Sequence, residues 1–297
     1  MDTTRLSSRV DETTARLNSP IIGLTRIAVG VLWLANLEWK RPPDFGKNQM
    51  NGLYKYVDSA VRLPVFAPYS WFVEHVVVKQ YTLFGWVTLL VESALAACLI
   101  LGLYTRAAAA VGAVMSVNIL LSVLHYDKSY EWPWSYYLMF AIHLLLIAAM
   151  AGRHWGLDGV LRAGAAKRRR AIQILGSVAV VIGVVGLVAS RSGSFAAEQG
   201  SLVGWSFLEL KVLWFNPLSA ILTAILGCVA LAGAMMNKRI LTVVSGAVFA
   251  FMALQVIIQW RYNDGAWTGG VLGGTGGNLA FWALLAAGLL KCTTSNA

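Results

Sequence analysis

Charged residues are scarce in this sequence. Only 13% of its 297 residues are Asp, Glu, Lys or Arg, whereas 58% are hydrophobic. Soluble domains carry about twice that charged share and a smaller apolar one. The scarcity excludes an ordinary soluble protein and indicates an integral membrane protein.

Cysteine and histidine are rare as well. The three cysteines, Cys98, Cys228 and Cys292, lie far apart and form no C-x-x-C, zinc or c-type haem motif. Haem held by two histidines needs a partner at the depth of His143, and the other three histidines fall at predicted helix boundaries. We therefore predict no metal and no haem.

The apolar residues gather into runs long enough to cross a bilayer. About 20 apolar residues form a helix that spans roughly 30 Å of hydrocarbon. No short apolar core with a small-residue cleavage site follows the polar residues 1–19, so we expect no cleaved signal peptide. About eight transmembrane helices are predicted, and the fold class is all-α. They lie near residues 20–37, 81–103, 107–124, 135–152, 172–190, 215–236, 240–260 and 279–290.

The positive charges predict an orientation. Lys and Arg concentrate in residues 153–170, in the turn at Arg106 and at residues 238–239, whereas the intervening short loops hold few. Because short basic loops stay in the cytoplasm, we expect a multi-pass plasma-membrane protein with both termini cytoplasmic. The net charge of +10 then reflects topology and contact with lipid head groups, and no nucleic-acid partner is expected.

The basic run divides the chain into two modules. We expect a cytoplasmic segment over 1–19, a four-helix membrane module over 20–165, a basic cytoplasmic connector over 166–171, and a second four-helix module over 172–297. Most polar residues within or beside helices belong to the first module, so any chemistry is expected there.

The first module carries a long external insertion, residues 38–80. Met50, Leu53, Val57 and Val61 recur in it at helical spacing, which predicts an amphipathic helix in the outer interface. Charged residues that collect near this boundary are expected to be mostly solvated. They are Glu38, Lys40, Glu74, His75, His125, Asp127, Lys128 and Glu131. In the second module, the glycine-rich segment 265–278 is expected to be a plain flexible loop.

Ionisable groups inside the predicted helices are the candidate site. A charge at mid-membrane is costly and usually faces a bundle interior, a partner or a cavity. Glu92 and His143 each stand midway through a helix, and Asn118 lies toward the outer side of its own. Arg26 is close enough in depth to pair with Glu92. Both a purely structural Glu92–Arg26 pair and a functional pocket fit this pattern, and His143 fits either a satisfied core histidine or a proton-exchanging group.

Three stretches resemble the DoxX/DoxD family of four-helix membrane proteins, which includes the small subunit of thiosulfate:quinone oxidoreductase. They are RIAVGVLWL at 26–34, VESALAACLILGLYTRAAA at 91–109 and WSYYLMFAIHLLLIAAMAGRHWGLDGVL at 134–161. The family pattern maps onto Arg26, Glu92, Gly102, Arg106, Gly152, Leu157 and Asp158. A more distant resemblance, to the membrane half of vitamin-K-dependent carboxylase-like proteins, rests on the same turn after Glu92 and on Leu157-Asp158.

The resemblance implies a quinone-interacting subunit of a membrane oxidoreductase, which oxidises thiosulfate or a related sulfur compound on the outer side. Quinone is the expected membrane substrate, with Glu92, His143 and Arg26 as catalytic residues and Asn118, Glu92 and His143 as binding residues. Because no redox cofactor site is evident, we expect other redox subunits as partners, besides membrane lipid. Two further functions remain open, a non-catalytic anchor or scaffold of a redox or envelope-assembly complex and a small-solute carrier with a site at the membrane midplane.

Overall fold

The computed structural model describes residues 3–126, 132–197, 200–205, 210–263 and 266–294, and most of them are helical. The elements of the first half are α1 (Thr3–Ala35), α2 (Gly52–Arg62), α3 (Ala67–Phe72), a π-helical turn (Val73–Val77), α4 (Tyr81–Leu101), α5 (Thr105–Val123), α6 (Pro133–Ala148), a 3-10 turn (Ala151–Arg153) and α7 (Leu157–Arg162). Those of the second half are α8 (Ala165–Ser190), β1 (Ser201–Trp205), β2 (Leu210–Phe215), α9 (Pro217–Met235), α10 (Arg239–Ile258), β3 (Trp260–Asn263), β4 (Ala266–Gly269), a 3-10 turn (Gly270–Leu272) and α11 (Gly276–Thr294).

Six helices among the described residues are long and apolar enough to cross a membrane. They are Leu17–Ala35 of α1, α4, α5, α8, α9 and α10. Helices also occupy the other two predicted positions, but the apolar stretch of α6, Trp134–Ala148, is shorter, and α11 is not among the six. The multi-pass membrane fold is therefore confirmed, whereas the predicted count of eight spans is not.

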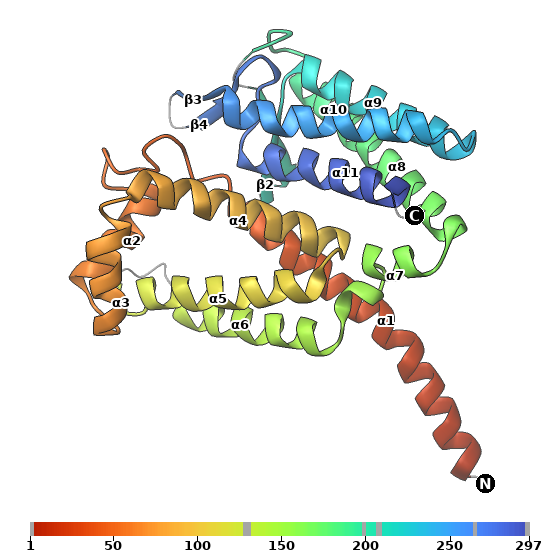
Figure 1. Ribbon diagram of the computed structural model, residues 1–297, viewed down its shortest axis with the longest axis horizontal. Helices are drawn as coiled ribbons and strands as arrows, with labels where there is room; N and C mark the ends of the chain where they lie inside the picture. The colour runs from red at the N-terminus through yellow and green to blue at the C-terminus, as the bar shows by residue number, and fades with distance from the viewer. Residues whose placement is uncertain (1–2, 127–131, 198–199, 206–209, 264–265, 295–297) are drawn as a thin grey trace.

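The connections between helices fall at two ends of the molecule (Figure 1). One end, named here the basic end, holds α7, the α4–α5 and α9–α10 turns and the C-terminus of α11, together with most of the clustered arginines. The opposite end, named the hairpin end, holds α2, α3 and the β3–β4 hairpin. This alternation agrees with the up-and-down order that the charge pattern predicts.

The structure is consistent with the predicted all-α membrane class, and two short antiparallel hairpins that were not predicted accompany the helices. β1 pairs with β2, with Ser201 opposite Phe215 and an irregularity after Val203, and β3 pairs with β4. The glycine-rich segment 265–278 was expected to be a flexible loop, and that prediction is wrong for its described residues. It forms β4, a tight turn and the start of α11, and a Cβ at Gly277 would lie 1.8 Å from the Val212 carbonyl oxygen. Only glycine allows α11 to begin so close to β2.

Small residues bring the helices of the second half together. A Cβ at Gly176 of α8 would lie 3.0 Å from the Gly227 carbonyl oxygen of α9, and one at Gly183 would lie 2.6 Å from the Ala224 nitrogen. Close backbone approach of this kind is the usual packing mode of helices in lipid, where hydrophobic attraction between helices is absent. The predicted connector 166–171 is part of α8, so the basic residues continue the helix.

Local signals in the sequence explain two helix ends. Asn216 Oδ1 caps α9 by accepting a hydrogen bond from the Ser219 amide, and Ser219 Oγ accepts one from the Asn216 amide. Pro217 follows at the first helical position. At the end of α4, Gly102 adopts a left-handed conformation, and the Leu103 amide donates back to the Cys98 carbonyl oxygen.

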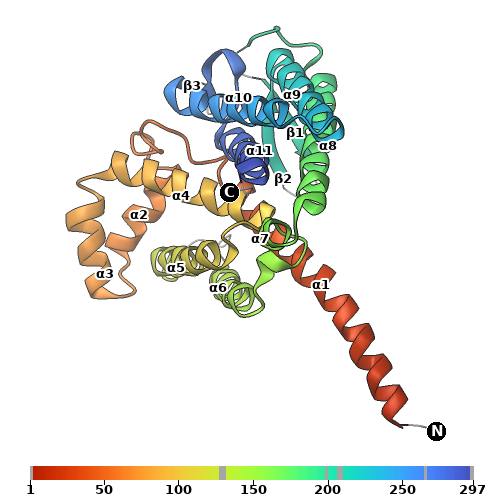
Figure 2. The same cartoon turned by 45° about the vertical axis from the view of Figure 1, so that its right-hand side comes forward.

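The predicted amphipathic helix in the 38–80 insertion is confirmed as α2, which buries Leu53 and Val57. The first half consists of α1, α4, α5 and α6, with α2 and α3 across its hairpin end (Figure 2). The second half meets it where α11 packs on α4 and where β2 contacts α1.

Asn278 joins α11 to β2, and its loss is expected to destabilise the second half. Its side-chain oxygen accepts hydrogen bonds from the Trp214 and Thr275 amides, and its side-chain nitrogen donates to the Trp214 carbonyl oxygen. Asn278→Leu leaves these groups unpaired, so we expect the free energy of unfolding to fall by about 2–4 kcal/mol, measured by thermal melting in detergent. Thr294→Ala, at the exposed end of the same helix, is the control. Equal melting temperatures for the two variants would contradict the assignment.

Candidate functional site

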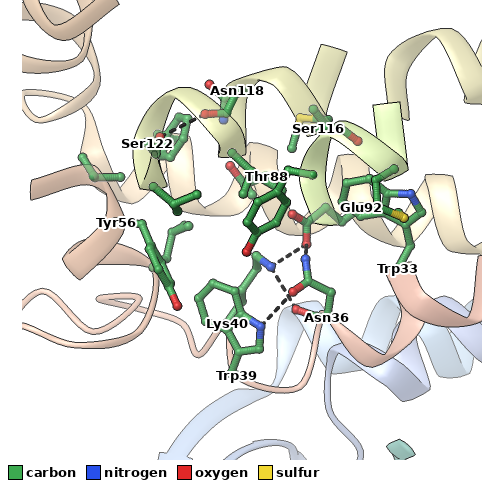
Figure 3. Close-up of a pocket in the computed structure, with 18 of the residues that line it drawn as sticks. Trp33, Asn36, Trp39, Lys40, Tyr56, Thr88, Glu92, Ser116, Asn118 and Ser122 are labelled. Atoms are coloured by element: carbon green, nitrogen blue, oxygen red, sulfur yellow. Dashed lines mark hydrogen bonds and ion pairs between the residues drawn. The ribbon is translucent and has the colours of Figure 1, made fainter. Parts of the chain in front are cut away.

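A pocket of about 510 Å³ lies inside the first half, toward the hairpin end (Figure 3). Helices α1, α4, α5 and α6 form its sides, and α2, α3 and the π-helical turn close it. Most of its lining is apolar or aromatic, with a small number of polar groups. This composition and size are typical of sites for small organic molecules.

Glu92 forms the centre of the polar wall. Its Oε2 lies 2.7 Å from the Nζ of Lys40, and both side chains are buried, at 1% and 2% exposed. Asn36 donates from Nδ2 to the same carboxylate oxygen over 3.3 Å, and Lys40 also donates to the Asn36 carbonyl oxygen over 2.9 Å. Figure 3 shows Glu92, Lys40 and Asn36 meeting at one edge of the pocket.

Trp39 completes this polar group. Its Nε1 donates to Asn36 Oδ1 over 2.9 Å, and the Lys40 ammonium lies 3.9 Å from the centre of its ring. A cation over an indole face is stabilised by the ring's electron density. We name Asn36, Trp39, Lys40 and Glu92 the buried polar cluster.

The sequence prediction missed Lys40. It was grouped with solvated charges at the outer boundary, but the chain turns after α1 and carries its side chain back into the bundle. The spacing of Asn36 and Lys40, four residues apart beyond an apolar helix, is the signal that indicates a shared direction. Burial lowers the pKa of Lys40, and the Glu92 charge and hydrogen bond oppose that shift.

The other predicted boundary charges are divided. Glu74 and His75 are exposed and lie beside each other, as expected. Glu38 is largely buried, accepts a hydrogen bond from Trp214 Nε1 over 2.9 Å, and so joins the turn after α1 to β2 of the second half. Burial raises the pKa of Glu38, and that hydrogen bond opposes the shift. Asp127, Lys128 and Glu131 lie outside the described residues.

Arg26 does not pair with Glu92. Its guanidinium donates to the carbonyl oxygens of Leu99 and Ile100 at the end of α4, and to those of His154 and Trp155 before α7. These partners lie at the basic end, away from the pocket. The structure therefore gives Arg26 a bundle-joining position, and the predicted Glu92–Arg26 pair is replaced by Glu92–Lys40.

Asp158 and three glycines complete this basic-end junction. The Asp158 carboxylate accepts hydrogen bonds from the amides of Tyr104 and Thr105 and so caps the start of α5. A Cβ at Gly102 would lie 2.5 Å from Gly156 Cα, and one at Gly152 would lie 2.2 Å from Asp158 Oδ2. Of the motif residues that resemble the family, Arg26, Gly102, Gly152 and Asp158 thus form a packed junction, and Glu92 lies in the pocket.

His143 lies behind the pocket wall. Trp33, which lines the pocket, donates from Nε1 to His143 Nε2 over 3.1 Å, and His143 Nδ1 lies 2.7 Å from the Met139 carbonyl oxygen. Because Nε2 accepts, Nδ1 carries the proton that bonds the carbonyl oxygen. Both ring nitrogens are used, so this geometry favours His143 as a support for Trp33.

Asn118 lines the pocket beyond the buried polar cluster. Its side-chain oxygen accepts a hydrogen bond from the Tyr69 hydroxyl over 3.1 Å, and that hydroxyl also lies 2.7 Å from Ser122 Oγ. Figure 3 shows Asn118 and Ser122 on the side of the pocket away from Trp33. The predicted residues Glu92 and Asn118 therefore share one pocket. Among the described residues, no group of three or more His, Cys, Asp or Glu side chains is arranged to hold a metal ion.

Replacing Lys40 alone is expected to lower the free energy of unfolding more than replacing both Lys40 and Glu92. Lys40→Met leaves the Glu92 carboxylate buried without its cation, so we expect the free energy of unfolding to fall by about 3–5 kcal/mol. Lys40→Met combined with Glu92→Leu should recover most of that loss. Thermal melting in nanodiscs measures both, with the exposed Lys79→Met as the control. A double variant that is no more stable than Lys40→Met would contradict the pairing.

Comparison with known proteins agrees with the resemblance seen in the sequence. The family model described as TQO small subunit DoxD matches residues 22–184, more than half of the chain. That range contains the pocket, the basic-end junction and most of α8. Neither the curated proteins nor the solved structures gave a match. The chain belongs to the DoxD family, which suggests a subunit of a membrane quinone oxidoreductase.

Proposed function

We propose that the chain is the quinone-interacting subunit of a membrane oxidoreductase and that the pocket holds the quinone ring. The observation that carries this proposal is the buried Glu92–Lys40 pair on the wall of a largely apolar pocket of about 510 Å³. Ionisable groups inside a membrane protein are expensive and typically mark ligand or proton sites. The family supports the same ligand class.

The pocket matches a quinone in shape and chemistry. A quinone ring is flat and apolar apart from its two carbonyl oxygens, and the aromatic and aliphatic lining suits its faces. At the buried polar cluster, the Lys40 ammonium is a donor for one carbonyl oxygen, and the Tyr69–Asn118–Ser122 group lies elsewhere along the pocket. Both kinds of polar group are held in place by hydrogen bonds before any ligand arrives.

The pair also supplies what reduction requires. Quinone becomes quinol by taking up two electrons and two protons, so negative charge develops on the ring oxygens as electrons arrive. Lys40 Nζ is placed to stabilise that charge and to give up a proton, which its burial favours. Glu92 holds the ammonium in position and is a second group for proton passage, while His143 keeps Trp33 oriented against the pocket.

The electron donor in this proposal is thiosulfate or a related sulfur compound on the outer side. Two thiosulfate ions that join through a new S–S bond release two electrons, which matches the demand of one quinone. If the sulfur compound does not contact the quinone directly, partner redox subunits carry the electrons between them. We also propose that the hairpin end faces outward and that both termini are cytoplasmic in the plasma membrane, because the basic end collects the arginines of the short loops.

The scaffold and carrier alternatives predict different behaviour of the pocket. A scaffold needs no small ligand there, and a carrier would move its solute between the two ends of the bundle. Between Glu92 and the basic end lies the packed junction, in which Arg26 donates to four carbonyl oxygens. This packing favours a binding site over a transport path.

Quinone binding to the full chain in nanodiscs tests the proposal. We expect a short-chain ubiquinone analogue to quench tryptophan fluorescence saturably in the wild type, since Trp33 and Trp39 line the pocket. Lys40→Met and Glu92→Gln should each weaken its binding about tenfold. Lys40→Met removes the charged donor for a quinone oxygen, and Glu92→Gln removes the carboxylate that holds this donor in position. Thiosulfate-dependent quinone reduction by the chain, or by the chain with its partner subunits, should fall in parallel.

Glu74→Gln is the matched control, because Glu74 is an exposed carboxylate at the hairpin end outside the pocket. Only variants whose melting shows a folded protein are compared. Wild-type protein that binds no quinone would overturn the proposal and favour the scaffold, and saturable binding unchanged in both folded pocket variants would place the site elsewhere.

A further inference from the structure

One side of α1 connects the pocket to the membrane-facing surface. Ile21, Leu24, Ala28 and Leu32 recur at helical spacing, and all four side chains are exposed. Leu32 is the last of them, is 52% exposed, and also lines the pocket. It belongs to the apolar span Leu17–Ala35, which is long and apolar enough to cross a membrane. The exposed apolar stripe of α1 therefore ends at a residue that lines the pocket.

Helix α6 borders the pocket beside Leu32, on the side of α1 that carries Trp33. The opposite side of α1 packs on α4, where a Cβ at Gly30 would lie 2.8 Å from the Ile100 amide nitrogen. Trp33 reaches His143 of α6, and the next pocket residues on that helix toward the hairpin end are Met139 and Tyr136. Helix α1 otherwise packs chiefly along α4, and α6 packs along α5. The two helices thus meet at Trp33–His143 and border the pocket beyond that contact.

We infer that the pocket opens sideways into the bilayer between α1 and α6, with Leu32 as its lip, and that its occupant is a quinone with a long isoprenoid tail. The inference rests on the proposed function. The ring lies at the buried polar cluster, and the tail passes Leu32 into the hydrocarbon. Such a tail keeps its apolar surface away from water throughout, which favours an opening at membrane depth over one at the aqueous surface.

The pocket has a second exposed lining residue, Phe72 of α3, which is 47% exposed. It lies outside the six apolar spans, at the hairpin end. An opening there would admit a ligand from the interface or from water. The two openings make different predictions for the length of the tail.

Replacing Leu32 distinguishes an opening at Leu32 from an opening at Phe72. Leu32→Trp narrows the opening with a larger apolar side chain, and Leu24→Trp places the same side chain two turns away on the same exposed apolar stripe, outside the pocket. Phe72→Trp alters the second exposed lining residue. Affinities for a decaprenyl quinone and for its tail-less ring analogue are measured by tryptophan quenching, with each variant referred to its own unquenched signal. All proteins are full-length chains in nanodiscs.

We expect Leu32→Trp to weaken binding of the long-tailed quinone on the order of tenfold and to leave binding of the tail-less analogue within about twofold, since the ring site is unchanged. Leu24→Trp should resemble the wild type for both ligands, and Phe72→Trp should change the binding of the two ligands to the same extent. Loss of long-tail binding in Phe72→Trp but not in Leu32→Trp would overturn the inference, as would equal effects of Leu32→Trp on both ligands. Wild-type protein that binds neither ligand would instead overturn the proposed function.

Discussion

The contact between Lys40 and Glu92 determines how the first half of this protein is arranged. A carboxylate in the middle of α4 is costly in hydrocarbon, and one ammonium at 2.7 Å makes it tolerable. To supply that ammonium, the chain turns at the end of α1 and brings Lys40 back between the helices, where Asn36 and Trp39 hold it. The pocket lies beside this group, and all four residues of the buried polar cluster line it.

The second half of the protein supports that turn. Leu37 is fully buried, and a Cβ at Gly276 would lie 3.1 Å from its Cβ, so α11 begins directly against the segment before Lys40. Glu38 also contacts the second half, where its carboxylate accepts the indole hydrogen of Trp214 in β2. Leu37 and Glu38 are thus fixed by the second half, while Lys40 is directed into the first. The second half thus has a structural role, because it holds the segment that carries Lys40.

Much of the fold follows from the sequence because lipid imposes simple rules on length and charge. The helix positions, the α2 amphipathic helix and the alternation of basic and less basic ends were all predicted from hydropathy, spacing and arginine counts. The two hairpins were missed because β1 to β4 are short and lie in segments that contain no alternating apolar pattern strong enough to stand out. The buried glycine segment was misjudged because composition does not distinguish a flexible loop from a close backbone approach.

The candidate site was predicted in part. Glu92 and Asn118 were singled out because they are polar groups on apolar helices, and the structure places both in one pocket. Depth alone made Arg26 the apparent partner of Glu92, but depth does not give the direction of a side chain around a helix. Arg26 faces the end of α4 and the segment before α7. The partner of Glu92 is Lys40, which lies beyond the end of α1, where a charge is ordinarily solvated. Similar depth also suggested His143, which contacts the pocket only through Trp33.

In the proposed function, a quinone ring occupies this pocket beside Glu92 and Lys40. The first measurement to make is photocrosslinking with an azido-quinone in nanodiscs, followed by peptide mapping of the full chain. We predict labels on residues 32–40 of α1 and its following turn and on residues 84–92 of α4, which excess unlabelled quinone removes. Labels confined to α8, α9 and α10, or labels that unlabelled quinone does not remove, would contradict this proposal.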